Sequence, residues 1–338
     1  MSCQHLKHPR SIDVHHHYFP LDIDKGKAND LACWRTPPGS LPWYAEKSIA
    51  AMDAAGIDVA ILSLPAIPTT IHATRESRFR ARQYNLSMKS MCTKYPSRFG
   101  FFATLPPLHD VEGALEEITY AFNELHVDGI ALASSYGSGS DAKFIGDTLF
   151  EPIWAELNKH AAVVFVHGTQ TPSSVPVPSP LLGLPISEVP NETFKAAAHL
   201  VVTGCKRRYP RVKVILAHLG GSTVMLAPRV AVLSEYMGSE LTADQILEDF
   251  KSFYFETALS AYEPNLLALN AFTSPDKILF GTDLPAVSAK MADWYTNNLK
   301  NHFANDAEKL TGILGVNALQ LFPRLSLVNN DSTRNEVL

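Results

Sequence analysis

The feature that most constrains the fold is the regular alternation of short apolar runs with longer helical patterns along the whole chain. Several runs are apolar on successive residues, so both faces of each strand should be buried, as in a parallel sheet covered by helices. The eight runs are Ser11–His17, Ile57–Leu64, Arg98–Leu105, Val127–Ala133, Ala162–His167, Val212–His218, Ser252–Ala258 and Lys277–Asp283.

Helical patterns lie between these runs. In the segment Asp110–Leu125, apolar Val111, Leu115, Ile118 and Phe122 recur at spacings of three and four, which gives a helix one apolar face. Similar patterns cover Glu46–Ala55, Glu192–Tyr209, Leu266–Phe272 and Ala286–Phe303. The chain therefore reads as a series of strand–helix units.

Eight such units in 338 residues, without a break in composition, predict a single (β/α)8 TIM-type barrel. We expect the barrel to span residues 11–325, with tails at 1–10 and 326–338. The alternative is an open doubly wound sheet. That fold usually has fewer strands and a glycine-rich fingerprint after the first strand, which this sequence lacks.

A proline-rich insert, residues 168–190, follows the fifth run and shows no periodicity. A loop of this length in a compact domain is usually functional or disordered. Proline stiffens a chain, so we expect an ordered wall of the active site or a subunit contact. The prolines are Pro172, Pro176, Pro178, Pro180, Pro185 and Pro190.

Composition and charge exclude several classes of protein. Hydrophobic residues make up 46% of the chain and charged residues 19%, which excludes a mostly disordered chain. The net charge of −5 offers no basic excess for binding nucleic acid. No apolar run approaches the roughly 20 residues that span a membrane. Four scattered cysteines and a polar N-terminus predict a cytoplasmic protein.

The chain contains 13 histidines, and three of them are consecutive at the end of the first run. Side chains alternate across a strand, so His15 and His17 should share one face while His16 points the opposite way. The fifth run ends at His167, and the sixth ends at His218. In a barrel the carboxyl ends of all strands meet at one mouth, so these imidazoles should converge.

The eighth run ends at Asp283, which adds a carboxylate to this mouth. His15, His17, His167 and Asp283 together supply three nitrogens and one oxygen. Such a set suits one divalent metal, Zn²⁺ above all, with Mn²⁺ or Fe²⁺ as further options. His218 is either another ligand or, as we favour, a hydrogen-bonding or proton-transfer group.

Several motifs occur in a specific order from about residue 12 to residue 322. They are Asp-x-His-x-His at 13–17, Ala-Met-Asp-Ala-Ala-Gly-Ile at 51–57, Tyr-Pro-Ser-Arg-Phe at 95–99, Phe-Val-His at 165–167, Ala-His-Leu-Gly-Gly at 217–221, Gly-Thr-Asp-Leu-Pro at 281–285 and Gly-Val-Asn-Ala at 315–318. With them the chain resembles the amidohydrolase superfamily, in its branch of non-oxidative decarboxylases. That branch includes aminocarboxymuconate-semialdehyde, γ-resorcylate and 6-methylsalicylate decarboxylases. The resemblance implies the four metal ligands named above and a catalytic role for His218.

The resemblance also bears on substrate binding and assembly. Arg229 lies where the muconate-semialdehyde enzyme places a carboxylate-binding arginine contributed across a dimer interface, which implies a homodimer. An ordinary cation on a helix surface is the alternative for Arg229. That enzyme also carries a substrate arginine just before a tryptophan, but here the loop before Trp43 has no basic residue. Arg35, next to Trp34, is the available substitute.

The expected pocket contains aromatic and apolar groups, among them Phe19 and Trp34, and few cations. This composition favours an aromatic monocarboxylate over a dicarboxylate. We predict a carboxy-lyase of secondary metabolism that converts 6-methylsalicylate to m-cresol. Asp283 would deliver a proton to the ring carbon, and His218 would stabilise that proton or hold the phenolate. The alternatives are a hydrolase of a lactone or amide, in which His218 activates water, and a metal-binding scaffold without catalysis.

Overall fold

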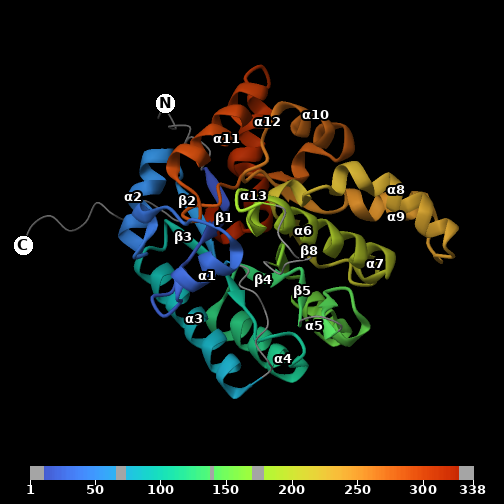
Figure 1. Ribbon diagram of the computed structural model, residues 1–338, viewed down its shortest axis with the longest axis horizontal. Coiled ribbons are helices and arrows are strands. Elements are labelled where there is room, and N and C mark those ends of the chain that lie inside the picture. The colour runs from blue at the N-terminus through green and yellow to red at the C-terminus, as the bar shows by residue number, and fades with distance from the viewer. Residues whose placement is uncertain (1–10, 66–73, 138–140, 170–178, 327–338) are drawn as a thin grey trace, which may run out of the picture.

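The computed structural model describes residues 11–65, 74–137, 141–169 and 179–326. Eight parallel strands form one sheet in the order β1-β2-β3-β4-β7-β8-β9-β10, and helices surround it (Figure 1). The strands are β1 (Ile12–His17), β2 (Val59–Ser63), β3 (Phe99–Thr104), β4 (Gly129–Ala133), β7 (Val163–His167), β8 (Lys213–Leu216), β9 (Tyr254–Glu256) and β10 (Ile278–Leu279). Each lies within one of the eight predicted runs, so that prediction is confirmed.

The sheet closes on itself where the segment after β10 meets β1. The amide of Val14 donates to the carbonyl of Phe280 at 3.0 Å, and the amide of Asp283 donates to the carbonyl of His15 at 2.9 Å. One residue further along each segment, His16 and Leu284 form a parallel bridge. Closure excludes the open doubly wound sheet and confirms the barrel.

Helices and short elements connect the strands. The α-helices are α1 (Lys25–Ala32), α2 (Ala45–Ala55), α3 (Arg75–Lys94), α4 (Val111–Tyr120), α5 (Glu151–Lys159), α6 (Leu184–Val202), α7 (Cys205–Arg208), α8 (Thr223–Tyr236), α9 (Ala243–Lys251), α10 (Glu263–Phe272), α11 (Ala289–His302), α12 (Ala307–Thr311) and α13 (Asn317–Leu321). A small antiparallel pair, β5 (Ser135–Tyr136) and β6 (Lys143–Phe144), lies outside the barrel sheet. None of the helices in the described part of the chain is both long and apolar enough to cross a membrane.

The amino end of the barrel is filled with apolar side chains. The rings of Phe102 and Phe165 stack inside the barrel with centroids 5.5 Å apart. Phe322, just after α13, packs on Phe102 with ring centroids 5.8 Å apart. Phe322 and Leu325 are almost completely buried with the interior residues Ile12 and Val59. The C-terminal part of the described chain therefore forms the floor of the barrel.

A β-bulge in β1 sets which side chains face the barrel interior. Asp13 pairs with Ala60 of β2, but His16 pairs with Leu62, so β1 advances three residues while β2 advances two. Strict alternation from Ile12 through the same residues, without a bulge, would turn His16 inward. The bulge places His15 and His17 inside instead. Bulges of this kind are common beside active sites.

The structure corrects the expectation for the proline-rich insert. Helix α6 starts at Leu184 and runs through Pro185 and Pro190, so the last part of residues 168–190 is helical. Proline lacks only an unused N–H in the first turn, and burial of residues such as Val189 supports the helix at Pro190. Insert residues 170–178 and the predicted tails, apart from Ser326, lie outside the described residues.

Two glycines allow α6 to approach the barrel mouth closely. A Cβ at residue 168 would lie 1.9 Å from the carbonyl oxygen of Val189, and one at residue 221 would lie 2.0 Å from that of Pro190. Gly168 follows His167, and Gly221 belongs to the turn that begins at His218. The start of α6 therefore packs directly against the two segments that carry these histidines.

Candidate active site

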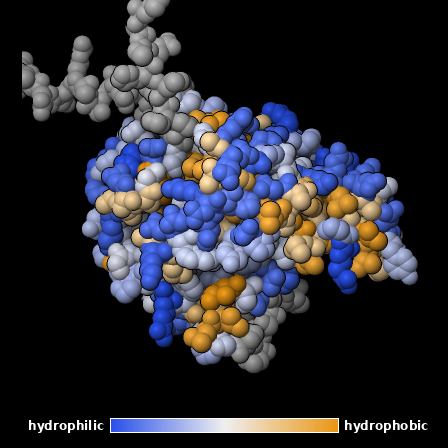
Figure 2. All heavy atoms as spheres, turned by 90° about the horizontal axis from the view of Figure 1, so that it is seen from above, coloured by the Kyte–Doolittle hydropathy of each residue, from blue (hydrophilic) through white to orange (hydrophobic). Residues whose placement is uncertain are grey.

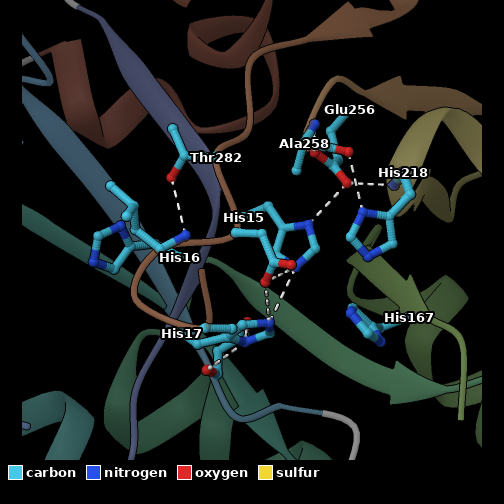
Figure 3. A network of polar contacts seen from close by, with 12 residues as sticks. His15, His16, His17, His167, His218, Glu256, Ala258 and Thr282 are labelled. Atoms are coloured by element: carbon cyan, nitrogen blue, oxygen red, sulfur yellow. Dashed lines mark hydrogen bonds and ion pairs between the residues drawn. The ribbon is translucent and has the colours of Figure 1, made fainter. Parts of the chain in front are cut away.

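Four buried imidazoles gather at the carboxyl end of the barrel (Figure 3). His15 and His17 come from β1, His167 ends β7, and His218 begins the turn after β8. The ring centroid of His15 lies 4.8 Å from that of His17, 5.2 Å from that of His167 and 4.9 Å from that of His218. The structure thus brings together all four histidines that the sequence placed at strand ends.

Three of these rings hold an oxygen acceptor at Nδ1. A ring whose Nδ1–H donates a hydrogen bond keeps a free electron pair on Nε2, which is the form that binds a metal or accepts a proton. The Nδ1 contacts are His15 to Glu256 Oε1 at 2.8 Å, His167 to the carbonyl of Gly168 at 2.9 Å, and His218 to the carbonyl of Ala258 at 3.1 Å. The fourth ring, His17, has its Nδ1 at 3.4 Å from the carbonyl of Ser63.

The free nitrogens meet the carboxylate of Asp283. The Nε2 atoms of His15 and His17 lie 3.1 Å apart. Asp283 Oδ1 lies 3.0 Å from Nε2 of His17 and 3.4 Å from Nε2 of His15. Ligands at about 2.0–2.2 Å from one ion have spacings of this order. With His167, whose ligand atom lies within 4.8 Å of those of His15 and His17, these residues fit a divalent metal.

The protonation states suit a cation. Burial lowers the pKa of His15 and His167 well below the usual value, so both imidazoles are neutral. Burial alone would raise the pKa of Asp283, but the neighbouring His15, His17 and His218 outweigh burial and hold the pKa of this carboxyl below its usual range. Neutral imidazoles and an ionised carboxylate are the forms that ligate metals.

Glu256 is a site residue that the sequence analysis missed. It is fully buried at the end of β9, where Oε1 accepts from His15 and from the amide of His218. Its Oε2 accepts from the amide of Ala258 at 2.7 Å. Burial raises the pKa of Glu256 to about 7. Glu256 therefore orients two histidines from behind. The missed signal was a charged residue inside the otherwise largely apolar run Ser252–Ala258.

A second buried polar network lies behind β1. Asp13, at the bulge, accepts from the amide of His15 and from the hydroxyl of Thr282, and its carboxylate also contacts the ring of His16. The other nitrogen of that ring contacts the hydroxyl of Ser48 on α2 at 2.6 Å. His16 thus points away from the metal-binding face, as strand alternation predicted. The network ties the bulge to the residue preceding Asp283.

The backbone is strained at two of the predicted catalytic residues. His218 has φ +56° and Asp283 has φ +65°, both in the left-handed region. A residue with a Cβ pays roughly 1–2 kcal/mol for this conformation. Strain of this kind collects at functional sites because the surrounding contacts hold it in place.

The predicted substrate-contacting residues lie in different environments. Phe19 is buried and stacks on His17, with ring centroids 6.2 Å apart and an interplanar angle of 22°. The indole nitrogen of Trp34 donates to the carbonyl of Ala286, shortly after Asp283. Arg35 is exposed, as is Arg229 on α8. Neither arginine joins the histidine cluster within the described chain.

A cleft of about 650 Å³ opens beside the cluster. His167 and Phe165 line its inner end, and residues of α1 and α3 line its outer part. Its inner walls are largely apolar, with Leu64, Pro65 and Leu105 among the lining residues. This volume lies within the usual range for small-molecule sites. Among the residues that line this cleft, the cations are Lys27 of α1 and Arg80 of α3, and the acidic residues are Asp22, Asp24 and Glu76, in line with the expectation of few cations.

Comparison with known proteins places the chain in a family. The family model described as amidohydrolase matches residues 12–324. The chain is 36% identical over 324 residues to a 6-methylsalicylic acid decarboxylase of Aspergillus aculeatus, covering 93% of this chain and 96% of that protein. The chain belongs to the amidohydrolase family. Within it, the chain falls in the branch of decarboxylases, as its motifs indicated.

Two further relatives extend this picture. A γ-resorcylate decarboxylase of a Rhizobium species is 28% identical over 262 residues, which cover 72% of this chain and 78% of that protein. A dihydroxybenzoic acid decarboxylase from a Polaromonas species was solved with bound manganese and the inhibitor 2-nitroresorcinol. Its fold matches with a TM-score of 0.78 at 23% identity, covering 93% of this chain and 97% of that one.

Proposed function

We propose that this amidohydrolase-family decarboxylase removes carbon dioxide from an ortho-hydroxy aromatic acid, and that 6-methylsalicylate is its substrate and m-cresol its product. The observation that carries the proposal is the convergence of three free imidazole nitrogens and the Asp283 carboxylate beside a largely apolar cleft. The relationship to the 6-methylsalicylic acid decarboxylase of Aspergillus aculeatus supports the choice of substrate.

In this proposal His15, His17, His167 and Asp283 hold one divalent cation, with Zn²⁺ favoured and Mn²⁺ as the other option. A bound cation supplies a Lewis acid and a template that orients a carboxylate next to an ortho hydroxyl. The donor set and its spacing support this assignment. Manganese in the Polaromonas relative supports a divalent metal in this fold.

The chain's own residues then manage one proton. Decarboxylation breaks the bond between the ring carbon and the carboxyl carbon, and a proton must take the place of the carbon dioxide that leaves. We assign proton delivery to Asp283, which faces the metal-binding nitrogens. Because this carboxylate is ionised in the free protein, it would take up one proton from solvent when the anionic acid binds and would give that proton to the ring carbon, which restores the ionised form. The unprotonated Nε2 of His218 would accept a hydrogen bond from the phenolic hydroxyl. Glu256 keeps His218 and His15 oriented throughout.

The direct test incubates the purified, metal-loaded protein with 6-methylsalicylate and measures m-cresol by chromatography together with released carbon dioxide. We expect one cresol for each carbon dioxide. A panel of lactones and amides tests the hydrolase alternative. Ring opening or amide cleavage without carbon dioxide from any ortho-hydroxybenzoate would overturn the proposal.

His218→Asn separates the role of His218 from that of a ligand. If His218 acts on substrate, the variant keeps stoichiometric metal by elemental analysis and loses roughly a hundredfold or more in kcat. Loss of the metal in this variant would instead make His218 a ligand. The metal-loaded wild-type protein, prepared in parallel, is the reference for both measurements.

We also propose a homodimer in which Arg229 faces the partner subunit. Arg229 lies on α8 in a stripe with Met225, Val232 and Tyr236, which are 72%, 59% and 85% exposed. Figure 2 shows apolar side chains on the arm that α8 and α9 form at the right of the view. Light scattering should give twice the chain mass, and Val232→Glu should give monomers. A wild-type monomer would remove the cross-subunit role of Arg229.

A further inference from the structure

A half-buried lysine lies at the mouth of the histidine cluster. Lys25 is the first residue of α1, and its ammonium nitrogen lies 4.3 Å from the centroid of the Phe19 ring. That ring stacks in turn on His17, with centroids 6.2 Å apart. The carboxylate of Asp283 also acts electrostatically on Lys25. The ammonium therefore lies one aromatic layer away from the metal-binding face of the barrel.

This position is unfavourable for the lysine in the protein alone. Among the described residues, the Lys25 ammonium has no carboxylate within ion-pair distance. The first turn of α1 contains a second cation, Lys27, and the acidic N-cap residue Asp24 accepts from the amide of Lys27 and forms no ion pair with the Lys25 ammonium. Burial lowers the pKa of Lys25, and Asp283 only partly opposes this effect. A charge held against such costs indicates a function.

The surroundings of Lys25 indicate what it binds. An ammonium over the face of an aromatic ring still directs its remaining hydrogen-bond donors outward. Lys25 holds these donors over Phe19, the ring that stacks on His17, and its α1 neighbours Lys27, Ala28 and Leu31 line the cleft. The aromatic acid of the proposed function is an anion, and none of the predicted arginines, Arg35 and Arg229, lies in this cleft.

We propose that Lys25 is a substrate-binding residue whose ammonium pairs with an anionic oxygen of the aromatic acid. The inference rests on the proposed function for the identity of the acid. Lys25 would then provide the charge recognition that the sequence predicted for Arg229 and Arg35. Because the pair forms on binding and is kept in the transition state, it should affect KM far more than kcat.

The test compares Lys25→Met and Lys25→Arg with the wild-type protein, all loaded with the same metal. Titration calorimetry measures the dissociation constants of salicylate, benzoate and 2-hydroxybenzamide, so binding is read independently of turnover. We expect Lys25→Met to weaken salicylate binding about ten- to a hundredfold, as for loss of a charged hydrogen bond. Lys25→Arg should recover part of this loss.

The three probes distinguish the two oxygens. If the carboxylate pairs with Lys25, Lys25→Met weakens salicylate and benzoate and spares 2-hydroxybenzamide. If the hydroxyl oxygen is the partner, salicylate and 2-hydroxybenzamide weaken and benzoate is spared. Lys300→Met is the matched control, because Lys300 is exposed at the far end of α11 and should leave all three constants unchanged.

Equal affinity of Lys25→Met and wild type for all three probes would overturn the inference, as would a loss of kcat at constant KM. Failure of the proposed function is distinguishable from both results. A wild-type protein that binds salicylate through Lys25 and yet releases no carbon dioxide from 6-methylsalicylate contradicts the substrate assignment alone. A wild-type protein that binds none of the probes contradicts the inference as well.

Discussion

The two ends of the barrel are built on opposite principles. The amino end is apolar and closely packed, with Phe322 and Leu325 completing a floor under the interior residues. The carboxyl end gathers four imidazoles and two carboxylates, and it holds His218 and Asp283 in the left-handed backbone region. Burial of apolar side chains stabilises the floor, whereas the mouth contains backbone strain and buried charges, which are typical of a binding site.

The largest expected effect comes from removing a ligand at the mouth. Asp283→Ala and His167→Ala should each abolish stoichiometric metal and lower kcat/KM at least about a thousandfold, since metal chemistry contributes several kcal/mol to such a reaction. Elemental analysis and a product assay measure the two effects. Asp293→Ala, at an exposed position of α11, is the control. Full retention of metal by either variant would refute the proposed ligand set.

Truncating a side chain in the floor should have the opposite effect, with a loss of stability and no loss of metal. Phe322→Ala removes a ring that is 2% exposed, and we expect about 3–5 kcal/mol of lost stability from the cavity. Denaturant unfolding of the metal-free protein measures the loss. At a low temperature, where the variant is still folded, the number of metal ions bound per chain should stay at the wild-type value. Phe79→Ala, where the ring is 63% exposed, should cost little and serves as the matched control.

If Phe322→Ala lost its metal while still fully folded, the two ends would be coupled, and their separation into a stabilising floor and a binding mouth would be wrong.

The smallest effect sharpens the comparison inside the mouth. Ser48→Ala removes the hydroxyl that lies 2.6 Å from Nε2 of His16, leaving a buried nitrogen without its partner. Because His16 holds Asp13 and thereby the bulge, we expect metal affinity to fall by up to about tenfold. Competition with a chelator measures it. Ser87→Ala, at an exposed position of α3, should have no effect. Unchanged affinity in Ser48→Ala would show that the network serves packing only.

Much of the mouth could be predicted from the sequence because one rule sufficed. Parallel strands end at the same edge, so a polar residue after each apolar run had to face the others. That rule brings together His15, His167, His218 and Asp283 without any knowledge of side-chain contacts. The rule missed Glu256, because this residue is the last of β9 and lies inside the seventh predicted run, Ser252–Ala258.

Other features depend on packing that a sequence pattern does not contain. The insert suggested a loop, but α6 begins at Leu184 because burial outweighs the cost of Pro190. Lys25 belongs to a short polar helix with no periodic signal, and only the folded chain places it over Phe19. The bulge in β1 also has no signal in the sequence, because only the pairing of β1 with β2 reveals it.

Because of that bulge, the side chains of the first strand alternate in one phase before it and in the opposite phase after it. Below it, Ile12 sets the inward phase for the floor, and above it His17 sets the opposite phase for the mouth. The inward-facing positions before the bulge therefore do not determine which residues face inward after it. A strand one residue shorter at this point would turn His15 and His17 inward by regular alternation. At the bulge, the carboxylate of Asp13 accepts from the amide of His15 and from the hydroxyl of Thr282, so it connects the first strand to the segment that carries Asp283.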